Sequence, residues 1–477
     1  EAGNILMDRI HSGNDGKALK SAVWYVVSSF LIRSIGLITT PVFTRLLTQD
    51  DYGQFSNYTS WLSILTIVIT LNLESTLMSA KYDYEKTLDR YFLSMICLSS
   101  LSVTAWAAVL NIFYDAGGQL FGLKKIYLNV MLLYLFFLPA ITMFQTRERF
   151  FYFYKKNVLL SVLISLSTAF LSVFLVMNMQ DRLTARILGS AVPSIVIGIV
   201  LYLYFICKVK QIDFSCWKYA LKICMPYIPH SLSLMLLNSM DRVMVNRIRG
   251  GRENALYSLA YSCALLITML FSALNNAYAP WLGEKLSQNE TGKIRDFSKK
   301  YVAFFFLFAA EFILAAPELV YIMGGTEYME AVYVIPPVGM ALAAQFTYAL
   351  FVNIEQYKKK TMGMAAASVS AAFLNYILNS LFIPKYGYFA AACTTLAGYL
   401  YILFVHMWIV KKLEYDSVYD YRFIFLCICA MGVFSMLSCI LYMHTAVRWT
   451  VMIFGFLCFV YYLIRNYENM ILVIKKR

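Results

Sequence analysis

The sequence predicts an all-α integral membrane protein of about fourteen transmembrane helices, built as two parallel six-helix bundles followed by two C-terminal helices. Composition is the first observation: 60% of the 477 residues are hydrophobic and 14% are charged, whereas soluble domains carry about 25% charged residues. Second, the apolar residues form blocks of roughly 20, the length that a helix needs to cross the hydrocarbon core of a bilayer. Third, an internal repeat relates two sets of six blocks.

The apolar blocks divide the chain into predicted spans and short polar connections. We expect spans at about 20–47, 54–79, 91–113, 126–146, 157–178, 184–207, 224–249, 255–281, 301–323, 331–353, 361–382, 388–410, 423–443 and 447–464. The predicted domains are a cytoplasmic tail at 1–19, an N-terminal bundle at 20–207, a cytoplasmic interfacial linker at 208–223, a C-terminal bundle at 224–411, spans 13 and 14 within 412–465, and a cytoplasmic tail at 466–477.

The distribution of basic residues predicts the orientation of these spans. With the N-terminus inside, and with residues near the span ends counted in the adjoining connections, 29 of the 41 Lys and Arg residues fall in cytoplasmic segments and 10 in external ones, and Arg33 and Arg242 lie deep within spans. This asymmetry is the positive-inside rule, so both termini are predicted to be cytoplasmic. Because the net charge of +14 is distributed in this way, it indicates membrane topology and not a nucleic-acid partner.

The repeat has an offset of about 200 residues. A shift of 202 places Arg45 on Arg247, and the same shift places 53–56 (Gly-Gln-Phe-Ser) on 255–258 (Ala-Leu-Tyr-Ser). A shift of 203 places 154–156 on 357–359 and 167–171 on 370–374. Six spans per unit is an even number, so both copies begin on the same side of the membrane. The halves are therefore predicted to be related by a pseudo-twofold axis along the membrane normal.

Polar residues recur at helical spacing on spans 1, 2, 7 and 8, which are equivalent pairs in the two halves. Polar groups inside spans are costly and usually face a cavity or a partner helix. We therefore predict a hydrated, partly cationic cavity between the halves. The alternative is hydrogen bonding between packed helices, with Asp241 neutralising Arg242. The candidate cavity residues are Ser29, Arg33, Thr40, Ser63, Thr70, Asn238, Asp241, Arg242, Asn275 and Asn276.

Two further acids and the remaining reactive side chains give weaker signals. Glu74 in span 2 and Glu311 in span 9 are candidates for coupling to H⁺ or Na⁺. His406 lies near a predicted cytoplasmic helix end, which suggests an interfacial residue. The ten cysteines show no metal-ligand spacing, and no phosphate-binding glycine loop is present, so we expect no metal, no cofactor and no enzymatic activity.

Several stretches resemble the polysaccharide repeat-unit flippases, a branch of the multidrug, oligosaccharidyl-lipid and polysaccharide exporter superfamily. These stretches are 44–56, Asp241-Arg242 followed by 255–260, 279–282, 375–387 and 390–395. The resemblance covers the whole chain, and the last two stretches are its most specific part. One departure is Ala255-Leu256, where the family often has a glycine before the tyrosine.

The resemblance implies a function. Such flippases translocate an undecaprenyl-diphosphate-linked oligosaccharide from the inner to the outer leaflet of the bacterial cell membrane, for assembly of cell-surface polysaccharide. By this resemblance the partners would be that lipid-linked substrate, membrane lipid and other polysaccharide-assembly proteins. Arg33 and Arg242 would suit the diphosphate, because a guanidinium can donate two hydrogen bonds at once. The Ser, Thr and Asn side chains would suit the sugars.

Two other functions stay open at this point. An ion-coupled exporter of cationic drugs from the same superfamily would have a cavity dominated by acids, and Asp241, Glu74 and Glu311 fit that expectation. A membrane polymerase of polysaccharide assembly would need a large external region for its acceptor, and the predicted external loops are short.

Overall fold

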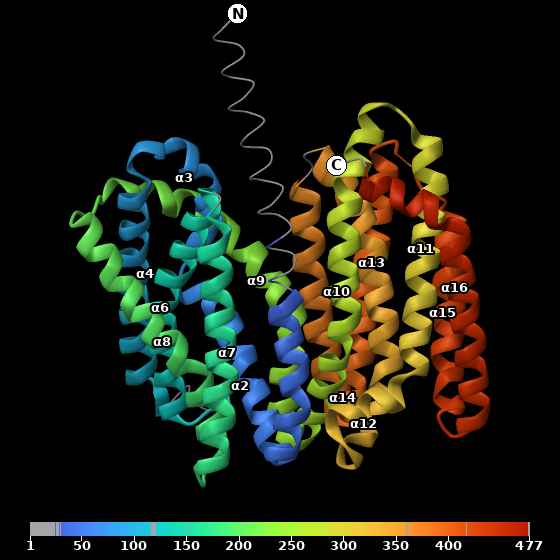
Figure 1. Cartoon of the computed structure of the whole chain (residues 1–477), viewed down its shortest axis with the longest axis horizontal. Helices are drawn as coiled ribbons and strands as arrows, with labels where there is room; N and C mark the ends of the chain where they lie inside the picture. Colours follow the sequence, from blue (N-terminus) through green and yellow to red (C-terminus); the bar gives the residue numbers. More distant parts are fainter. Residues whose placement is uncertain are drawn as a thin grey trace, which may run out of the picture. The chain divides into compact units, whose positions relative to one another are not determined.

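The computed structural model describes residues 24, 28, 30–115, 121–151, 153–358, 361–415 and 417–475, with side chains described up to residue 465 and not at residue 361. The described residues form helices and contain no β-strand (Figure 1). Residues 30–46 are helical. The helices that follow are α2 (Gln49–Ile69), η1 (Leu73–Thr76), α3 (Leu77–Asp83), η2 (Glu85–Thr87), α4 (Leu88–Ile112), α6 (Lys125–Phe150), α7 (Tyr154–Asn178), α8 (Arg182–Val209), α9 (Ser215–Arg249), α10 (Gly251–Ser287), α11 (Thr291–Leu314), α12 (Ala316–Gly324), η3 (Thr326–Val334), α13 (Ile335–Tyr357), α14 (Thr361–Lys412), α15 (Tyr421–Leu441) and α16 (Thr445–Lys475).

The predicted fold class, an all-α membrane protein, is confirmed. Among the described residues, ten helices are long and apolar enough to cross a membrane, and twelve if two bent helix pairs each form one span. One of the ten, Met362–Lys412, contains both predicted spans 361–382 and 388–410. The predicted tail 1–19 and part of the first span lie outside the described residues. Counting Met362–Lys412 as two spans and adding the first predicted span raises the count from twelve to fourteen.

Breaks and caps in the helices follow from local sequence. Thr48 caps α2 by accepting a hydrogen bond from the Asp51 backbone N–H at 3.1 Å. Asp181 caps α8 in the same way, through the backbone N–H of Thr184 at 3.0 Å, as expected for these residue types. Gly387 breaks α14 with φ +65° and ψ −151°, a conformation that is open to glycine alone. The chain therefore turns back on itself there, and the two halves of α14 can pack together.

The predicted linker 208–223 is not a separate element. Its last nine residues are the start of α9, which runs without interruption from Ser215 to Arg249. Cys216, Ala220 and Cys224 are spaced one turn apart and buried in a core that also contains residues of α4 and α8. This side of the segment packs on protein, while Phe214 is exposed.

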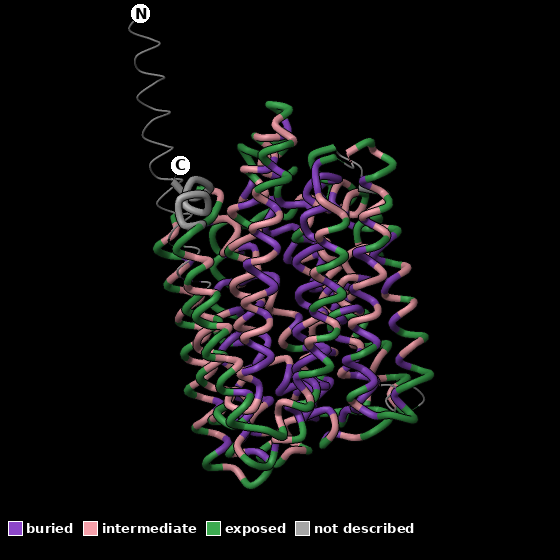
Figure 2. The backbone as a smooth tube through the Cα atoms, turned by 90° about the vertical axis from the view of Figure 1, so that its right-hand side faces the viewer, coloured by how far each residue is buried: buried purple, intermediate pink, exposed green. Residues whose placement is uncertain are grey.

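The chain divides into two compact units, residues 1–232 and 233–477. In the first unit, α8 packs against α6 and α7, and α4 packs against α6. In the second unit, α13 packs against α10, α11, α14 and α15, and Phe305 of α11 stacks on Phe346 with ring centroids 4.0 Å apart. Buried and exposed residues alternate along most helices (Figure 2). The most apolar windows of α7 and α16 are only 6% buried, so these two helices present apolar surface that suits lipid.

Candidate functional site

Asp241 of α9 lies in the interior of the second unit, with 2% of its surface exposed. Three neutral groups from other helices donate to its carboxylate. The Tyr257 hydroxyl of α10 donates to Oδ2 at 2.7 Å, the Asn379 amide of α14 donates to Oδ1 at 2.5 Å, and the Thr395 hydroxyl of α14 donates to Oδ2. Hydrogen bonds of this kind are what a buried carboxylate requires, because desolvation would otherwise disfavour its charge.

A second layer of hydrogen bonds holds these donors in place. Asn379 Nδ2 also donates to Asn375 Oδ1 at 2.9 Å, and Asn379 Oδ1 accepts from the Thr394 hydroxyl. Asn375 and Asn379 share a face of the first half of α14 because they are four residues apart. The turn at Gly387 brings Thr394 and Thr395 of the second half opposite them. We call Asp241, Tyr257, Asn375, Asn379, Thr394 and Thr395 the Asp241 network.

No base neutralises Asp241 at close range. Among the described residues it forms no ion pair within 4.0 Å. Arg242 is half-buried and places its guanidinium carbon 5.3 Å from the centre of the Tyr261 ring. The structure therefore shows no Asp241–Arg242 salt bridge. A carboxylate surrounded by neutral oxygen and nitrogen groups can take up a proton or a small cation.

The other predicted residues of α9 and α10 lie around this network or on nearby faces. Asn238, one turn before Asp241, is exposed and accepts from the Tyr399 hydroxyl at 2.9 Å. Asn275 accepts from the Asn353 amide of α13 at 3.0 Å. Asn276 is exposed. The structure thus gathers Asn238, Asp241 and Arg242, and places Asn275 in a separate contact between α10 and α13.

In the first unit the hydroxyls predicted to line the cavity are bonded within their own helices. Arg33 is exposed on the helix 30–46, and Ser29 lies outside the described residues. The hydroxyls of Thr40, Ser63 and Thr70 each donate to a carbonyl oxygen four residues earlier, at 2.9, 2.9 and 2.6 Å. Hydroxyls satisfied in this way within a helix do not require a cavity.

The two further acids occupy different surroundings. Glu74 is exposed in η1 beside Thr70 and Thr142, in the lining of a small pocket of the first unit. Glu311 of α11 packs against α16, where a Cβ at Gly455 would lie 2.0 Å from Glu311 Oε1. Glu311 is therefore placed at a helix contact and not in the Asp241 network.

Sequence reasoning missed most partners of Asp241 and a second buried acid. The available signal was the pair Asn375 and Asn379, one turn apart in an apolar stretch. This second acid is Glu355 of α13 in the second unit. A hydrogen bond of 2.6 Å joins its Oε1 to Nδ1 of His406 on α14, and both side chains are almost wholly buried. His406 is thus buried within the protein. No group of three or more His, Cys, Asp or Glu among the described residues could hold a metal ion.

Comparisons with known proteins give a family. Residues 18–285 match a family model described as polysaccharide biosynthesis protein. The Haemophilus influenzae protein named "Lsg locus putative protein 1" is 24% identical over 380 residues, which are 75% of this chain and 89% of that protein. An uncharacterized membrane protein of the same organism is 22% identical over 292 residues, which are 58% of this chain and 68% of that protein.

Two solved structures show the fold. The lipid II flippase MurJ, in an inward closed conformation, matches with a TM-score of 0.71 at 14% identity, over 94% of this chain and 100% of its own. A multidrug resistance transporter of the MATE family and MOP superfamily, in an inward-facing conformation, matches with a TM-score of 0.57 at 13% identity, over 81% of this chain and 95% of its own.

Proposed function

Because this chain belongs to the polysaccharide biosynthesis protein family, as its sequence resemblance predicted, we propose that it is a flippase for lipid-linked oligosaccharides. Its substrate would be an undecaprenyl-diphosphate-linked repeat unit. The protein would carry this unit from the inner to the outer leaflet of the bacterial cell membrane, for assembly of a cell-surface polysaccharide. Both termini would lie in the cytoplasm.

The observation that carries this proposal is the full-length likeness to a lipid II flippase, which covers 94% of this chain and all of that one. The name of that protein states that it flips a lipid. The family description connects the present chain to polysaccharides. A flippase for a lipid-linked saccharide satisfies both findings.

Recognition of the substrate would divide between charge and neutral polar groups. Arg33 and Arg242 are the two cations deep within predicted spans, and each could donate a two-pronged hydrogen bond to the diphosphate. Arg242 is half-buried beside Tyr261, where a lower local dielectric strengthens such a bond. Asn238 and Asn276 are exposed residues, and amide side chains suit sugar hydroxyls. Movement would follow alternating access, with the cavity opening to one side at a time.

The Asp241 network would supply the energy coupling. Its buried carboxylate and the hydroxyl and amide oxygens of Thr395, Tyr257 and Asn379 suit the binding of H⁺ or Na⁺. Of these three acids, Asp241 has the most hydrogen-bond partners, and Glu74 is exposed. We therefore place the coupling ion at Asp241 in preference to Glu74 or Glu311.

Reconstitution in liposomes tests the proposal. A fluorescent undecaprenyl-diphosphate oligosaccharide is placed in the inner leaflet, and its arrival in the outer leaflet is followed with a membrane-impermeant glycosidase. We expect faster arrival than in liposomes without protein. In cells, deletion of the gene should cause the lipid-linked oligosaccharide to accumulate on the inner leaflet.

The second candidate function is export of cationic drugs, and the buried acid at Asp241 is the observation that favours it. The same liposomes decide between the two. Uptake of a cationic dye in exchange for H⁺ or Na⁺, with no movement of the lipid-linked oligosaccharide, would replace the flippase assignment with the exporter one.

A further inference from the structure

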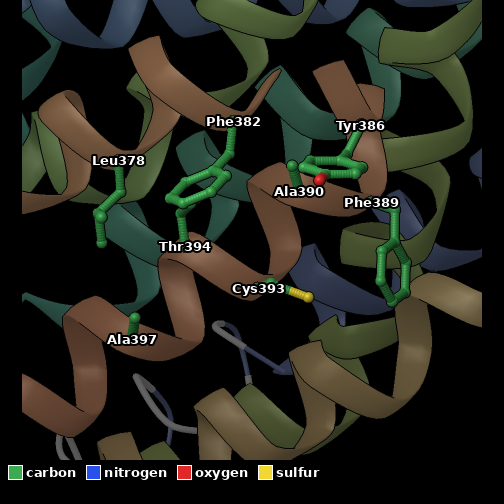
Figure 3. Close-up of a pocket in the computed structure, with 8 residues that line it drawn as sticks. All are labelled: Leu378, Phe382, Tyr386, Phe389, Ala390, Cys393, Thr394 and Ala397. Atoms are coloured by element: carbon green, nitrogen blue, oxygen red, sulfur yellow. The ribbon is translucent and has the colours of Figure 1, made fainter. Parts of the chain in front are cut away.

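A groove lies between the two halves of α14, on either side of the turn at Gly387 (Figure 3). It has a volume of about 370 Å³ and all eight residues that line it belong to α14. Leu378, Phe382 and Tyr386 come from the first half, and Phe389, Cys393 and Thr394 come from the second. This volume is near the lower end of ligand pockets in proteins, so the groove has room for a segment of one hydrocarbon chain and not for a bulky headgroup.

The lining is suited to hydrocarbon. Phe382, Tyr386 and Phe389 are exposed by 42%, 65% and 43%, so each of the three aromatic side chains that line the groove leaves a large part of its surface uncovered. Two lining residues carry hydroxyls, Tyr386 and Thr394, and the Thr394 hydroxyl already donates to Asn379. A ligand in the groove would therefore gain apolar contacts and would find few polar partners.

A lysine, Lys385, adjoins the lining residue Tyr386 near the turn at one end of the groove. At the Gly387 turn, Glu253 accepts from the Tyr388 backbone N–H at 3.1 Å and pairs with Arg249 at 2.8 Å. Arg252 pairs with Glu330. Lys385, next to Tyr386, is exposed and has no ion pair among the described residues. The turn thus offers one unneutralised cation beside the aromatic mouth of the groove.

We propose that this groove binds the single isoprenoid chain of a polyprenyl diphosphate lipid, with its diphosphate near Lys385. The inference rests on the proposed flippase function and adds a site for the lipid part of the substrate. A long apolar chain that ends in an anion complements an apolar groove that ends in a cation. Glycerophospholipids carry two chains. A groove with room for one chain would leave their second chain outside.

Thr394 connects the groove to the Asp241 network. Thr394 lines the groove and also donates to Asn379, which in turn donates to Asp241. A chain in the groove therefore lies one side chain away from the Asp241 network. Occupancy by the substrate lipid can bias that network, and this contact gives the coupling site a means of sensing that substrate is bound.

A labelling experiment on the unmodified chain tests the site directly. Cys393 lines the groove and is exposed, and Cys458 of α16 is exposed but does not line it. The rate at which an apolar maleimide labels each thiol is measured by peptide mass spectrometry, with undecaprenyl diphosphate or phosphatidylglycerol added. We expect undecaprenyl diphosphate to slow labelling at Cys393 and not at Cys458, and phosphatidylglycerol to slow neither.

A pair of matched variants tests the groove in transport. Ala397→Phe fills the groove, whereas Leu381→Phe adds similar bulk at an exposed position on the same helix outside it. We expect Ala397→Phe to raise the KM for the lipid-linked substrate about tenfold, the effect of losing roughly two buried methylene groups. Leu381→Phe should leave the KM unchanged.

The outcomes separate the two proposals. Equal protection of Cys393 by phosphatidylglycerol, or no protection by either lipid, overturns the groove site. A wild-type KM for Ala397→Phe, in a protein that flips its substrate, overturns it as well and leaves the flippase function standing. Protection of Cys393 by undecaprenyl diphosphate without any flipping upholds the site and overturns the proposed function.

Discussion

At the scale of single residues, Asp241 shows what a sequence reveals and what it conceals. Its polar helical face, shared with Asn238 and Arg242, identified it as a candidate. Its partners Tyr257, Asn379 and Thr395 come from two other helices, between 16 and 154 residues away in the chain. Which side chains meet Asp241 depends on helix packing, and periodicity within one helix carries no information about it.

Asp241→Asn tests the coupling role. We expect transport to fall at least about tenfold and to lose its response to an imposed H⁺ or Na⁺ gradient, because the amide keeps the shape of the carboxylate and cannot take up a cation's charge. Protein abundance should stay near wild type, since removing a buried charge offsets the loss of one hydrogen bond of about 1 kcal/mol. Asp50→Asn, at an exposed position in the first turn of α2, is the control. Unchanged gradient dependence in Asp241→Asn would assign Asp241 a structural role.

Arg33 is the residue on which the predicted diphosphate contact depends. Arg33→Lys keeps the charge and loses the planar fork, so it should retain partial transport. Arg33→Ala removes both, and a charged hydrogen bond worth about 1.5–3 kcal/mol corresponds to a loss of roughly 10- to 150-fold in transport rate. Arg45→Ala, an exposed arginine at the end of the same helix, serves as the control. Parental rates in Arg33→Ala would remove Arg33 from the site.

At the scale of helices, composition located nearly every element and missed the bends. The predicted spans 361–382 and 388–410 fall on the two halves of α14, and their predicted gap contains the Gly387 turn. The predicted spans 54–79 and 301–323 are each broken, by 49° and 58°. Leu71 and Asn72 adopt positive φ at the first break. Such a break changes a few dihedral angles and leaves the apolar composition unchanged, so a hydropathy window cannot register it.

Asp420 shows how one residue starts a helix. It caps α15 through the Phe423 backbone N–H at 3.1 Å, and it also contacts Lys299 at 2.8 Å. The hydrogen bond from Lys299 and the bond from Phe423 lower the pKa of Asp420 to about 2. A carboxyl whose pKa is lowered by folding stabilises the fold above its unfolded pKa of about 3.9, and this contribution is lost as the pH falls toward 2.

Two substitutions at Asp420 separate the cap from the charge. Asp420→Ala removes both and should lower the unfolding free energy of the purified protein by about 1 kcal/mol. Asp420→Asn keeps a capping side chain and loses the ion pairs, whose basic partners are exposed and which are worth about 0–1 kcal/mol. The unfolding free energy of Asp420→Asn at pH 7 should therefore be closer to that of wild type. This variant should also lack the loss of stability between pH 4 and about 2 that Asp420 causes in the wild-type protein. Thermal unfolding in detergent at pH 7 and at low pH measures both effects. Equal losses in the two variants would show that the ion pairs, and not the cap, matter.

At the scale of the whole molecule, the family and the fold were within reach of the sequence, because both depend on composition and on contiguous motifs. The stretches 375–387 and 390–395, which supported the resemblance most strongly, also contain Asn375, Asn379 and Thr395 of the Asp241 network. The orientation in the membrane and the parallel relation of the halves stay predictions. Both depend on which side of the bilayer each connection occupies.

Reporter fusions test that orientation. We expect a fusion at Gly251 or Gly325 to report an external position, and one at Gly292 a cytoplasmic position, because the segment around Gly292 carries Lys285, Lys293 and Arg295. The helix between Gly251 and Ser287 has 37 residues and is about 55 Å long at 1.5 Å per residue, more than the roughly 30 Å of a hydrocarbon core. It is therefore long enough to place its two ends on opposite sides. If Gly251 and Gly292 reported the same side, α10 would not cross the membrane, the second half would contain five spans against six in the first, and the six-plus-six repeat would be wrong.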